Sequence, residues 1–436
     1  MRKSIIAGVL SCVLLVSCSS EVDIPSFSVI NITLDEGDVS RPTVAVSKER
    51  GSVNWSWIRK DQDGWNVYVS SLDETSGDRT VPVRVNHIPG NANPHSQAPA
   101  QIAIGSEGNL YVVWTNSLLV EGRRFPASNL LFSRSEDGGE TWSPEIAVNS
   151  DSDGPPSGHT FHNIVTLENG ALVVSWIDSR ERDKIAALNS DLGHDNPDSP
   201  ASHEMMHSAQ TDESGREVGS QIWISRSLDG GRSFEETTIA DHNACPCCRT
   251  NLAVDEAGAI YLTWRHEFEN GARDIVIARS DDNAVTFSEP VRVSNDNWVI
   301  EACPHAGPGL AVDESGNVHV SWYTAADSGV GLFRAISTNR ASTFQPREAV
   351  FTDQTISHGA FSLMAPGTFA IASEVVSPKS IVISVLSNSD QSREPQEIGK
   401  ITGSTPSFAG NGQISALAYS NGDSIMARVW VPESLD

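Results

Sequence analysis

The sequence predicts an all-β fold, a single β-propeller in which four-stranded blades surround a central channel. Two recurring phrases and the composition of the strands between them carry this prediction. Strands rich in Val, Ile and aromatic residues alternate with turns rich in Gly and Asp, as expected for antiparallel sheets. The phrases return at intervals of about 45–90 residues, which favours propeller blades over a solenoid.

The first phrase is an apolar strand, a glycine turn and a second strand that ends in Trp or its equivalent. The clear copies are Pro42 to Trp57, Pro99 to Trp114, Phe161 to Trp176, Asn251 to Trp264 and Gly307 to Trp322. Weaker copies are Ala360 to Glu374 and Pro406 to Tyr419. One copy in each blade gives seven blades, and six blades with the last copy as an extra ribbon is the alternative.

The last blade lacks a fourth strand, and the first strand of the propeller lacks a blade. The final copy continues into a third strand from Asp423 to Val431, with nothing after Asp436. We therefore expect Phe27 to Leu34 to supply its fourth strand, because this pairing closes the ring and removes an exposed sheet edge.

The second phrase marks a tight turn between the third and fourth strands of a blade. Its best copy is Ser135-x-Asp137-x-Gly139-x-Thr141-Trp142, the next runs from Ser227 to Phe234, and decayed copies run from Ser280 to Phe287 and from Ser337 to Phe344. The Asp side chain can accept hydrogen bonds from nearby backbone N–H groups, Gly permits a positive φ, and the aromatic residue packs back between the strands. This motif is structural. It resembles the Asp box, or BNR repeat, of the sialidase-like β-propellers, and the resemblance covers nearly the whole mature chain in pattern.

The first residues resemble a bacterial lipoprotein signal. A basic start at Arg2 and Lys3 precedes an apolar run, Ile5 to Val16, that is too short to span a bilayer. The ending Leu15-Val16-Ser17-Cys18 resembles the lipobox, which implies that residues 1–17 are removed, that Cys18 carries the lipid, and that residues 18–26 link it to a propeller over 27–436. Ser19 resembles an outer-membrane address. A plain secretory signal is the alternative, and both interpretations export the chain.

The net charge of −26 becomes −28 once the two basic residues leave with the signal. A field of this sign repels nucleic acid, so nucleic-acid binding is excluded. We expect a monomer that meets the membrane only through its lipid, with a small ligand or a glycan as its other partner.

Meander geometry separates the two faces of the propeller. The Asp turns lie on one face, and the loops that lead into the innermost strands lie on the other, around the channel mouth. Metal-type side chains precede five successive innermost strands, namely His95, His159, His162, Cys245, Cys247, Cys248, Cys303, His305 and His358. The insertion 178–221 in blade three hangs from the same face and carries His207 beside Met205 and Met206.

From this set we predict a transition-metal site. The predicted ligands are Cys245, Cys247, Cys248, Cys303, His305, His159, His162 and His207. Soft sulfur ligands with imidazole favour copper or zinc over magnesium or calcium. Disulfides are the alternative in an exported chain. A bridge between the adjacent Cys247 and Cys248 would be strained, so pairing would tie the Cys245 loop to Cys303.

The sialidase resemblance implies a second site on the same face, with arginines that clamp a sugar carboxylate, a Tyr–Glu nucleophile pair and an Asp acid/base. Ser40-Arg41-Pro42 matches the Arg-Ile-Pro phrase of the family without its Ile. The candidates are Arg41, Arg249 and Arg265 for the clamp, Tyr323 or Tyr419 with Glu301 for the nucleophile pair, and Asp178 for the acid. Pairing of the arginines with surface carboxylates is the alternative, and a seventh blade departs from the six of sialidases.

Three classes of function follow from these observations. The first is a propeller that binds a ligand at the channel mouth with a Cys/His metal site. The second is a glycoside hydrolase of the exo-α-sialidase type, and the third is a cell-surface module that recognises a glycan or a protein. Because function depends on the site and not on the fold, the distances among the Cys and His side chains separate these classes.

Overall fold

The computed structural model describes residues 26–47, 51–72, 77–121, 126–150, 156–191, 210–211, 217–352, 356–387 and 395–432. Within these ranges the chain is nearly all β, with six sheets of four or more strands and a single helix. The prediction of an all-β protein is therefore confirmed.

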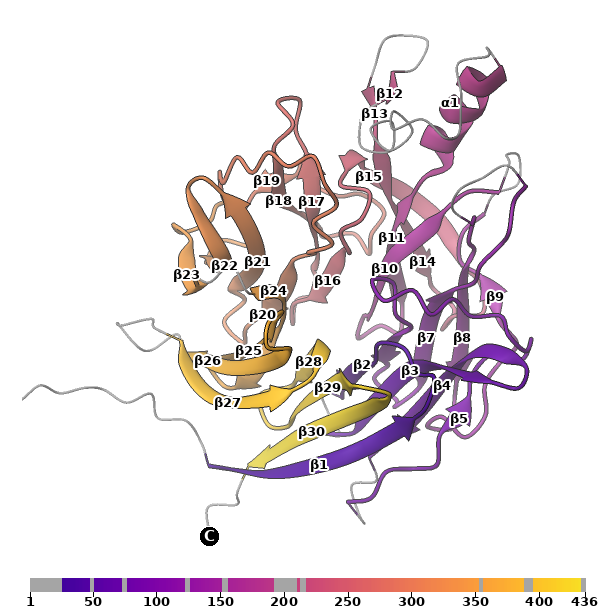
Figure 1. The fold of residues 1–436 in the computed structure, drawn as a ribbon, viewed down its shortest axis with the longest axis vertical. Helices are drawn as coiled ribbons and strands as arrows, with labels where there is room; N and C mark the ends of the chain where they lie inside the picture. The colour runs from indigo at the N-terminus through magenta and orange to yellow at the C-terminus, as the bar shows by residue number, and fades with distance from the viewer. Residues whose placement is uncertain are drawn as a thin grey trace, which may run out of the picture.

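The large sheets are antiparallel meanders of strands that follow one another along the chain (Figure 1). The first two sheets are β2 (Thr43–Val46), β3 (Val53–Asp61), β4 (Gly64–Ser71) and β5 (Val83–Arg84), then β6 (Gln101–Ile104), β7 (Leu110–Thr115), β8 (Leu130–Ser135) and β9 (Ile146–Ala147). An eight-stranded sheet follows, with β10 (His159–Thr166), β11 (Leu172–Asp178), β14 (Ser220–Ser227) and β15 (Glu235–Ala244), then β16 (Asn251–Val254), β17 (Ile260–Glu267), β18 (Arg273–Ser280) and β19 (Val291–Arg292).

Three further sheets complete the set. They are β20 (Gly309–Val312), β21 (Val318–Ala326), β22 (Gly329–Ser337) and β23 (Glu348–Phe351), then β24 (Ile356–Ala365), β25 (Thr368–Val375), β26 (Ser380–Ser387) and β27 (Gln396–Thr402), and finally β28 (Ser404–Gly410), β29 (Ser415–Asn421), β30 (Ser424–Pro432) and β1 (Phe27–Glu36).

The eight-stranded sheet consists of two four-stranded meanders that meet at one residue pair, Ala244 with His266. The first strands of all the four-stranded meanders are β2, β6, β10, β16, β20, β24 and β28. Each contacts the next in chain order, and β28 contacts β2. We call the side on which the chain runs into these first strands the inner-loop face.

The N-terminal strand pairs as predicted. In Figure 1 the indigo β1 lies along the yellow β30, and the antiparallel register joins Phe27 to Pro432 at one end and Glu36 to Ser424 at the other. Leu34 is fully buried there, in a cluster with Trp55 and Trp57. The pairing covers the edge that β30 would otherwise expose.

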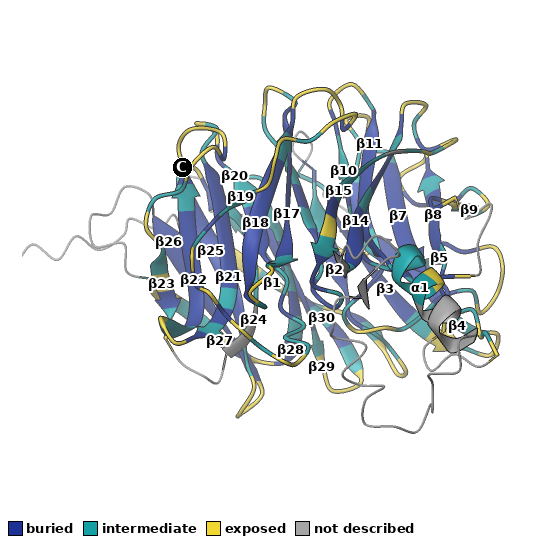
Figure 2. Ribbon diagram, turned by 90° about the horizontal axis from the view of Figure 1, so that it is seen from above, coloured by how far each residue is buried: buried dark blue, intermediate teal, exposed yellow. Residues whose placement is uncertain are grey.

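The Trp that ends each clear copy of the first phrase lies in the second strand of its meander and is buried. These residues are Trp57, Trp114, Trp176, Trp264 and Trp322, and none is more than 1% exposed. Each indole N–H donates a hydrogen bond, for example to the Asp178 carboxylate from Trp176 at 2.9 Å and to Asp296 from Trp322 at 2.6 Å. Figure 2 shows the resulting distribution, with dark blue strands inside and yellow loops outside. The repeat therefore combines an apolar core with satisfied indole donors.

The hydrogen bonds expected for the second phrase are present. Asp137 accepts from the Thr141 amide at 2.9 Å, and Gly139 has a φ of +98°. Hydrogen bonds from the Thr141 hydroxyl and amide lower the pKa of Asp137 to about 2. In the two decayed copies Ala284 and Ala341 occupy the glycine position with a φ of +61° each.

The insertion between β11 and β14 begins with a helix that the sequence did not lead us to expect. Helix α1 (Arg180–Asp191) starts with acidic residues in its first turn, which suits the positive end of a helix dipole. A short hairpin of β12 (Gln210–Thr211) and β13 (Glu217–Val218) follows. Within the described part of the chain, no helix combines the length and the apolar character needed to cross a bilayer.

Candidate functional site

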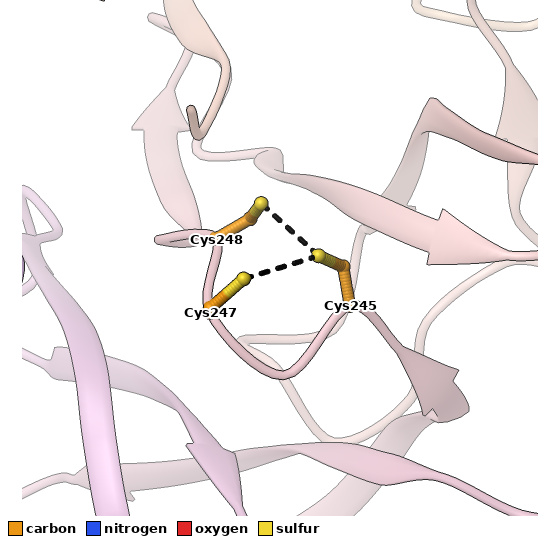
Figure 3. Close-up of side chains that lie close together, drawn as sticks. All are labelled: Cys245, Cys247 and Cys248. Atoms are coloured by element: carbon orange, nitrogen blue, oxygen red, sulfur yellow. Dashed lines mark hydrogen bonds between the residues drawn. The ribbon is translucent and has the colours of Figure 1, made fainter. Parts of the chain in front are cut away.

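Three cysteine side chains converge on the inner-loop face, in the turn that joins β15 to β16. The sulfur of Cys245 lies 3.8 Å from that of Cys247 and 3.1 Å from that of Cys248 (Figure 3). All three sulfurs lie within 4.8 Å of one another, and the residues are 0%, 5% and 1% exposed respectively. All three thiols are free. The turn therefore forms a compact and buried group of sulfur ligands.

A fourth thiol lies beside this group. Cys303, on the loop before β20, is half-buried and shares a side-chain hydrogen bond with Cys247. The loop of Cys303 and the turn of Cys245 belong to successive meanders, so two loops supply the thiols. The disulfide that was the alternative for the Cys245 loop and Cys303 is not formed in the described structure, where the two loops meet through thiols.

Arg265 is hydrogen-bonded to the three-thiol turn through its backbone carbonyl. Its guanidinium donates to the backbone carbonyls of Arg273 at 2.7 Å, Ala306 at 3.1 Å and Tyr323 at 2.8 Å. Its own carbonyl accepts from the Cys245 amide at 2.9 Å. Among the described residues no carboxylate lies within 4.0 Å of this guanidinium, although Arg265 is only 1% exposed. A buried cation of this kind favours a negative charge nearby.

The ionisation of the thiols follows from burial and from this cation. Burial raises the pKa of Cys245 to about 12. Burial opposes ionisation of Cys248 as well, but hydrogen bonds from Cys245 and Cys247 and the charge of Arg265 bring its pKa well below the usual range. The contact with Cys247 also lowers the pKa of Cys303. The group is therefore set to carry negative charge on part of its sulfurs.

The donor set suits a soft transition metal. In a tetrahedral thiolate site with metal–sulfur bonds of about 2.3 Å, neighbouring sulfurs are about 3.8 Å apart. The separation of Cys245 and Cys247 equals that edge at 3.8 Å, whereas the 3.1 Å separation of Cys245 and Cys248 would have to lengthen. All-sulfur ligation selects copper(I) or zinc over harder ions.

The predicted histidine ligands have other partners. The Nδ1 atom of His159 lies 2.6 Å from the Ser128 carbonyl, and its Nε2 atom lies 3.3 Å from Asp178. The Nε2 atom of His162 lies 3.1 Å from the Val113 carbonyl, and burial lowers the pKa of His162 to about 4. Within the described ranges neither imidazole joins the three-thiol group. His207 and Cys18 lie outside the described residues.

Two predicted arginines of the inner-loop face, Arg41 and Arg249, interact electrostatically, and each also interacts with Glu374, which sequence analysis missed. Burial and the charge of Arg249 both bring the pKa of Arg41 well below its usual value. Burial lowers the pKa of Arg249 to about 10, against the opposing charges of Cys248 and Glu374. Glu374, at the end of β25, accepts from the Thr405 amide at 3.1 Å. Arg41 itself donates to the Ser96 carbonyl at 3.1 Å.

Strained backbone surrounds this charged group. Phe161, His305 and Thr405 have φ angles of +55°, +50° and +53°, and each lies at or just before a first strand on the inner-loop face. Such conformations cost about 1–2 kcal/mol for a residue with a Cβ, and they concentrate at functional sites. Phe161 also stacks edge-on against His95, with ring centroids 5.7 Å apart. The inner-loop face is therefore the candidate site by strain as well as by charge.

The other predicted catalytic residues share no hydrogen bond or ion pair with Arg41 or Arg249 among the described residues. Asp178 accepts from Arg180 at 2.9 and 2.7 Å, and despite burial its hydrogen bonds with His159 and Arg180 lower its pKa to about 2. A carboxyl of this kind is ionised at neutral pH and has no proton to donate. Glu301 is exposed, and no hydrogen bond joins it to Tyr323 in the described structure. Arg265 serves the cysteine turn instead.

No protein-family model matches the chain, and no curated protein matches it. Solved structures match nearly the whole chain at low identity. An ulvan lyase of polysaccharide lyase family PL25 is 11% identical with a TM-score of 0.56, over 91% of this chain and 95% of the lyase. A Dyadobacter fermentans protein of unknown function is 14% identical with a TM-score of 0.48, over 94% of this chain and 100% of that one. The Hadza microbial sialidase Hz136 is 13% identical with a TM-score of 0.49, over 86% of this chain and 76% of the sialidase. The likeness to the lyase supports a β-propeller-like fold.

Proposed function

We propose that this chain is an exported, lipid-anchored β-propeller of seven blades that binds a copper or zinc ion at its inner-loop face. The single observation that carries the metal site is the convergence of three buried thiol sulfurs within 4.8 Å in one turn. The cyclic contacts among the first strands support a closed ring of seven. The hydrogen-bonded turns at Asp137 and Asp229 support Asp boxes on the opposite face.

Cys245, Cys247 and Cys248 would hold the ion, with Cys303 available from the neighbouring loop. A bound ion would supply a positive charge that stabilises the sulfurs as thiolates. Arg265 orients the turn through its carbonyl and offsets the negative charge of the ligands. The chain's own contribution is a closed, water-poor set of soft donors.

Elemental mass spectrometry of the full chain, purified under reducing conditions, tests this proposal. We expect about one equivalent of copper or zinc per chain, retained through gel filtration. Cys245→Ser and Cys248→Ser should abolish retention, whereas Cys303→Ser, which removes the sulfur outside the three-thiol group, should preserve it. Absence of bound metal, together with no uptake of added Cu(I) or Zn²⁺ by folded protein, would reject the site.

The anchor and the processed N-terminus need a separate measurement. Mass spectrometry of the mature protein should find a lipid-modified Cys18 as the first residue, with residues 1–17 removed. A mature chain that begins at another residue and carries no lipid would reject the anchor and favour a plain secretory signal.

A second candidate function is recognition of a glycan carboxylate. The observation that favours it is the pair Arg41 and Arg249, which lie near enough for the charge of Arg249 to lower the pKa of Arg41. Guanidinium groups that converge on one point could bind a carboxylate. A sialidase-type hydrolase or a surface glycan receptor would both use this pair.

Calorimetric titration with uronic acid and sialic acid oligosaccharides tests the second candidate. Arg41→Ala should weaken binding about tenfold or more. Arg232→Ala, on the Asp-turn face and paired with Glu136, should not change it. Release of sugar from a fluorogenic sialoside, lost in Arg41→Ala, would identify a hydrolase, and binding without release would identify a receptor.

A further inference from the structure

The four thiols of the inner-loop face fall into two pairs. The sulfurs of Cys245 and Cys248 lie 3.1 Å apart, and two residues separate them in the Cys-Pro-Cys-Cys turn. Cys247 and Cys303 form the other pair through their side-chain hydrogen bond. A disulfide bond is about 2.05 Å long, so the first pair needs a movement of only about 1 Å to close.

Cys303 is more exposed than the other three cysteines. Cys245, Cys247 and Cys248 are no more than 5% exposed, whereas Cys303 is half-buried on its loop. A reagent from solution therefore meets the sulfur of Cys303 first. Cys247 lies between this outer sulfur and the inner pair, in hydrogen-bond contact with Cys303 and 3.8 Å from Cys245.

We propose that these four cysteines form a thiol–disulfide exchange site that accepts a low-molecular-weight disulfide at Cys303 and stores the oxidation as a Cys245–Cys248 disulfide. This inference goes beyond the proposed metal site, and it rests on the proposed function only in using the same sulfurs. Oxidation would convert two of the three proposed metal ligands into a disulfide and would therefore prevent metal binding.

The exchange balances as a series of sulfur transfers. The thiolate of Cys303 attacks the external disulfide R–S–S–R, forms a mixed disulfide and releases one R–S⁻. Cys247 attacks the Cys303 sulfur and releases the second R–S⁻, leaving a Cys247–Cys303 disulfide.

The inner pair then receives the oxidation. Cys245 attacks the Cys247 sulfur, 3.8 Å away, and frees Cys303, and Cys248 then attacks the Cys245 sulfur, 3.1 Å away, and frees Cys247. The external disulfide is reduced to two thiols, and one inner disulfide is formed. Both protons from the newly joined cysteines leave on the released thiols.

Incubation of the reduced, metal-free full chain with oxidised glutathione tests the proposal. Peptide mapping without reduction should find a Cys245–Cys248 disulfide, with free Cys247 and Cys303 and two equivalents of reduced glutathione released per chain. Cys303→Ser should slow the reaction about tenfold or more yet yield the same inner disulfide. Cys245→Ser should stop at the Cys247–Cys303 disulfide, which also shows that the variant has folded with its loops in contact.

Two results would overturn the inference. One is four free thiols in the folded wild-type chain after prolonged incubation. The other is an inner disulfide that forms equally fast in wild type and Cys303→Ser. Metal uptake separates this failure from failure of the proposed function. Reduced chain that binds metal but never forms the disulfide rejects the exchange site alone, and chain that forms the disulfide but takes up no metal rejects the metal site alone.

Discussion

Gly307 lies directly against the backbone of Arg249, so that a Cβ at position 307 would stand 2.5 Å from the Arg249 carbonyl oxygen and 3.0 Å from its amide nitrogen. The loop that carries Cys303 and the turn that carries Cys248 are therefore packed without room for a methyl group. The contact joins the two loops that supply the thiols, so backbone packing determines how these loops lie relative to each other.

Gly307→Ala should move the cysteine turn without removing a ligand. We expect about a tenfold or larger loss of metal affinity, as for other changes that displace the support of metal ligands, measured by competition with a chromophoric chelator. Gly399→Ala is the matched control, because a Cβ there would lie 3.9 Å from the Arg428 side chain in ordinary contact. Unchanged affinity in folded Gly307→Ala would mean that the turn does not depend on this contact.

Gly231 in an Asp turn and Gly170 in the turn between β10 and β11 offer a comparison of two glycines with the same backbone conformation. Gly231 and Gly170 both have a φ of +82°, but a Cβ at 231 would overlap the Phe132 ring whereas a Cβ at 170 would meet nothing within 4 Å. Gly231→Ala should lower the free energy of unfolding by about 2–4 kcal/mol, and Gly170→Ala by about 1–2 kcal/mol. Urea denaturation measures both, and equal losses would show that the packing against Phe132 relaxes freely.

The N-terminal strand should contribute to global stability through Leu34. This side chain is 0% exposed, whereas Val29 on the same strand is 44% exposed. Leu34→Ala should cost about 2–4 kcal/mol and Val29→Ala about 0.5 kcal/mol or less. A melting temperature that is equally insensitive to both changes would contradict the role of β1 as a core strand.

Asp178 should make stability depend on acid pH. Its folded pKa of about 2 lies below the ordinary value of 3.8, so its contribution is complete above the ordinary pKa and disappears as the pH falls from about 4 towards 2. The contribution at neutral pH is about 2 kcal/mol. Asp178→Asn should therefore lower stability at pH 7 and differ less from wild type near pH 2.

Denaturant titrations across this pH range measure the effect, with the exposed Asp423→Asn as the control. A constant difference between wild type and Asp178→Asn at every pH would show that the ion pair with Arg180 carries no linkage to protonation.

The parts of the fold that sequence analysis predicted are those that local chemistry determines. A Trp at the end of a strand and an Asp-Gly turn each specify their own conformation, and the unpaired Phe27 strand had an incomplete sheet to match. Helix α1 was missed because its residues are polar and give little amphipathic pattern. The bridge between Ala244 and His266 joins two meanders through one residue pair, which leaves no periodic trace in the sequence.

The candidate site was predicted in its position and only partly in its members. Topology placed the cysteines before neighbouring first strands, and three of them meet. His159 and His162 share that position, but their imidazoles contact the carbonyls of Ser128 and Val113 in the adjacent sheet. The sequence alone does not show whether a histidine contacts a carbonyl or a metal ion. Glu374 was missed because it ends a strand in a weak copy of the repeat and reaches Arg41 only through the closure of distant sheets.

The pairing of β1 with β30 also affects the order in which the strands assemble during folding. Phe27 and Pro432 meet in one sheet, so β1 gains its partner only from a strand about 400 residues further along the chain. Contacts across so long a stretch of sequence form slowly and late. Pairing of β1 with β30 should therefore be among the last steps in which the described strands assemble.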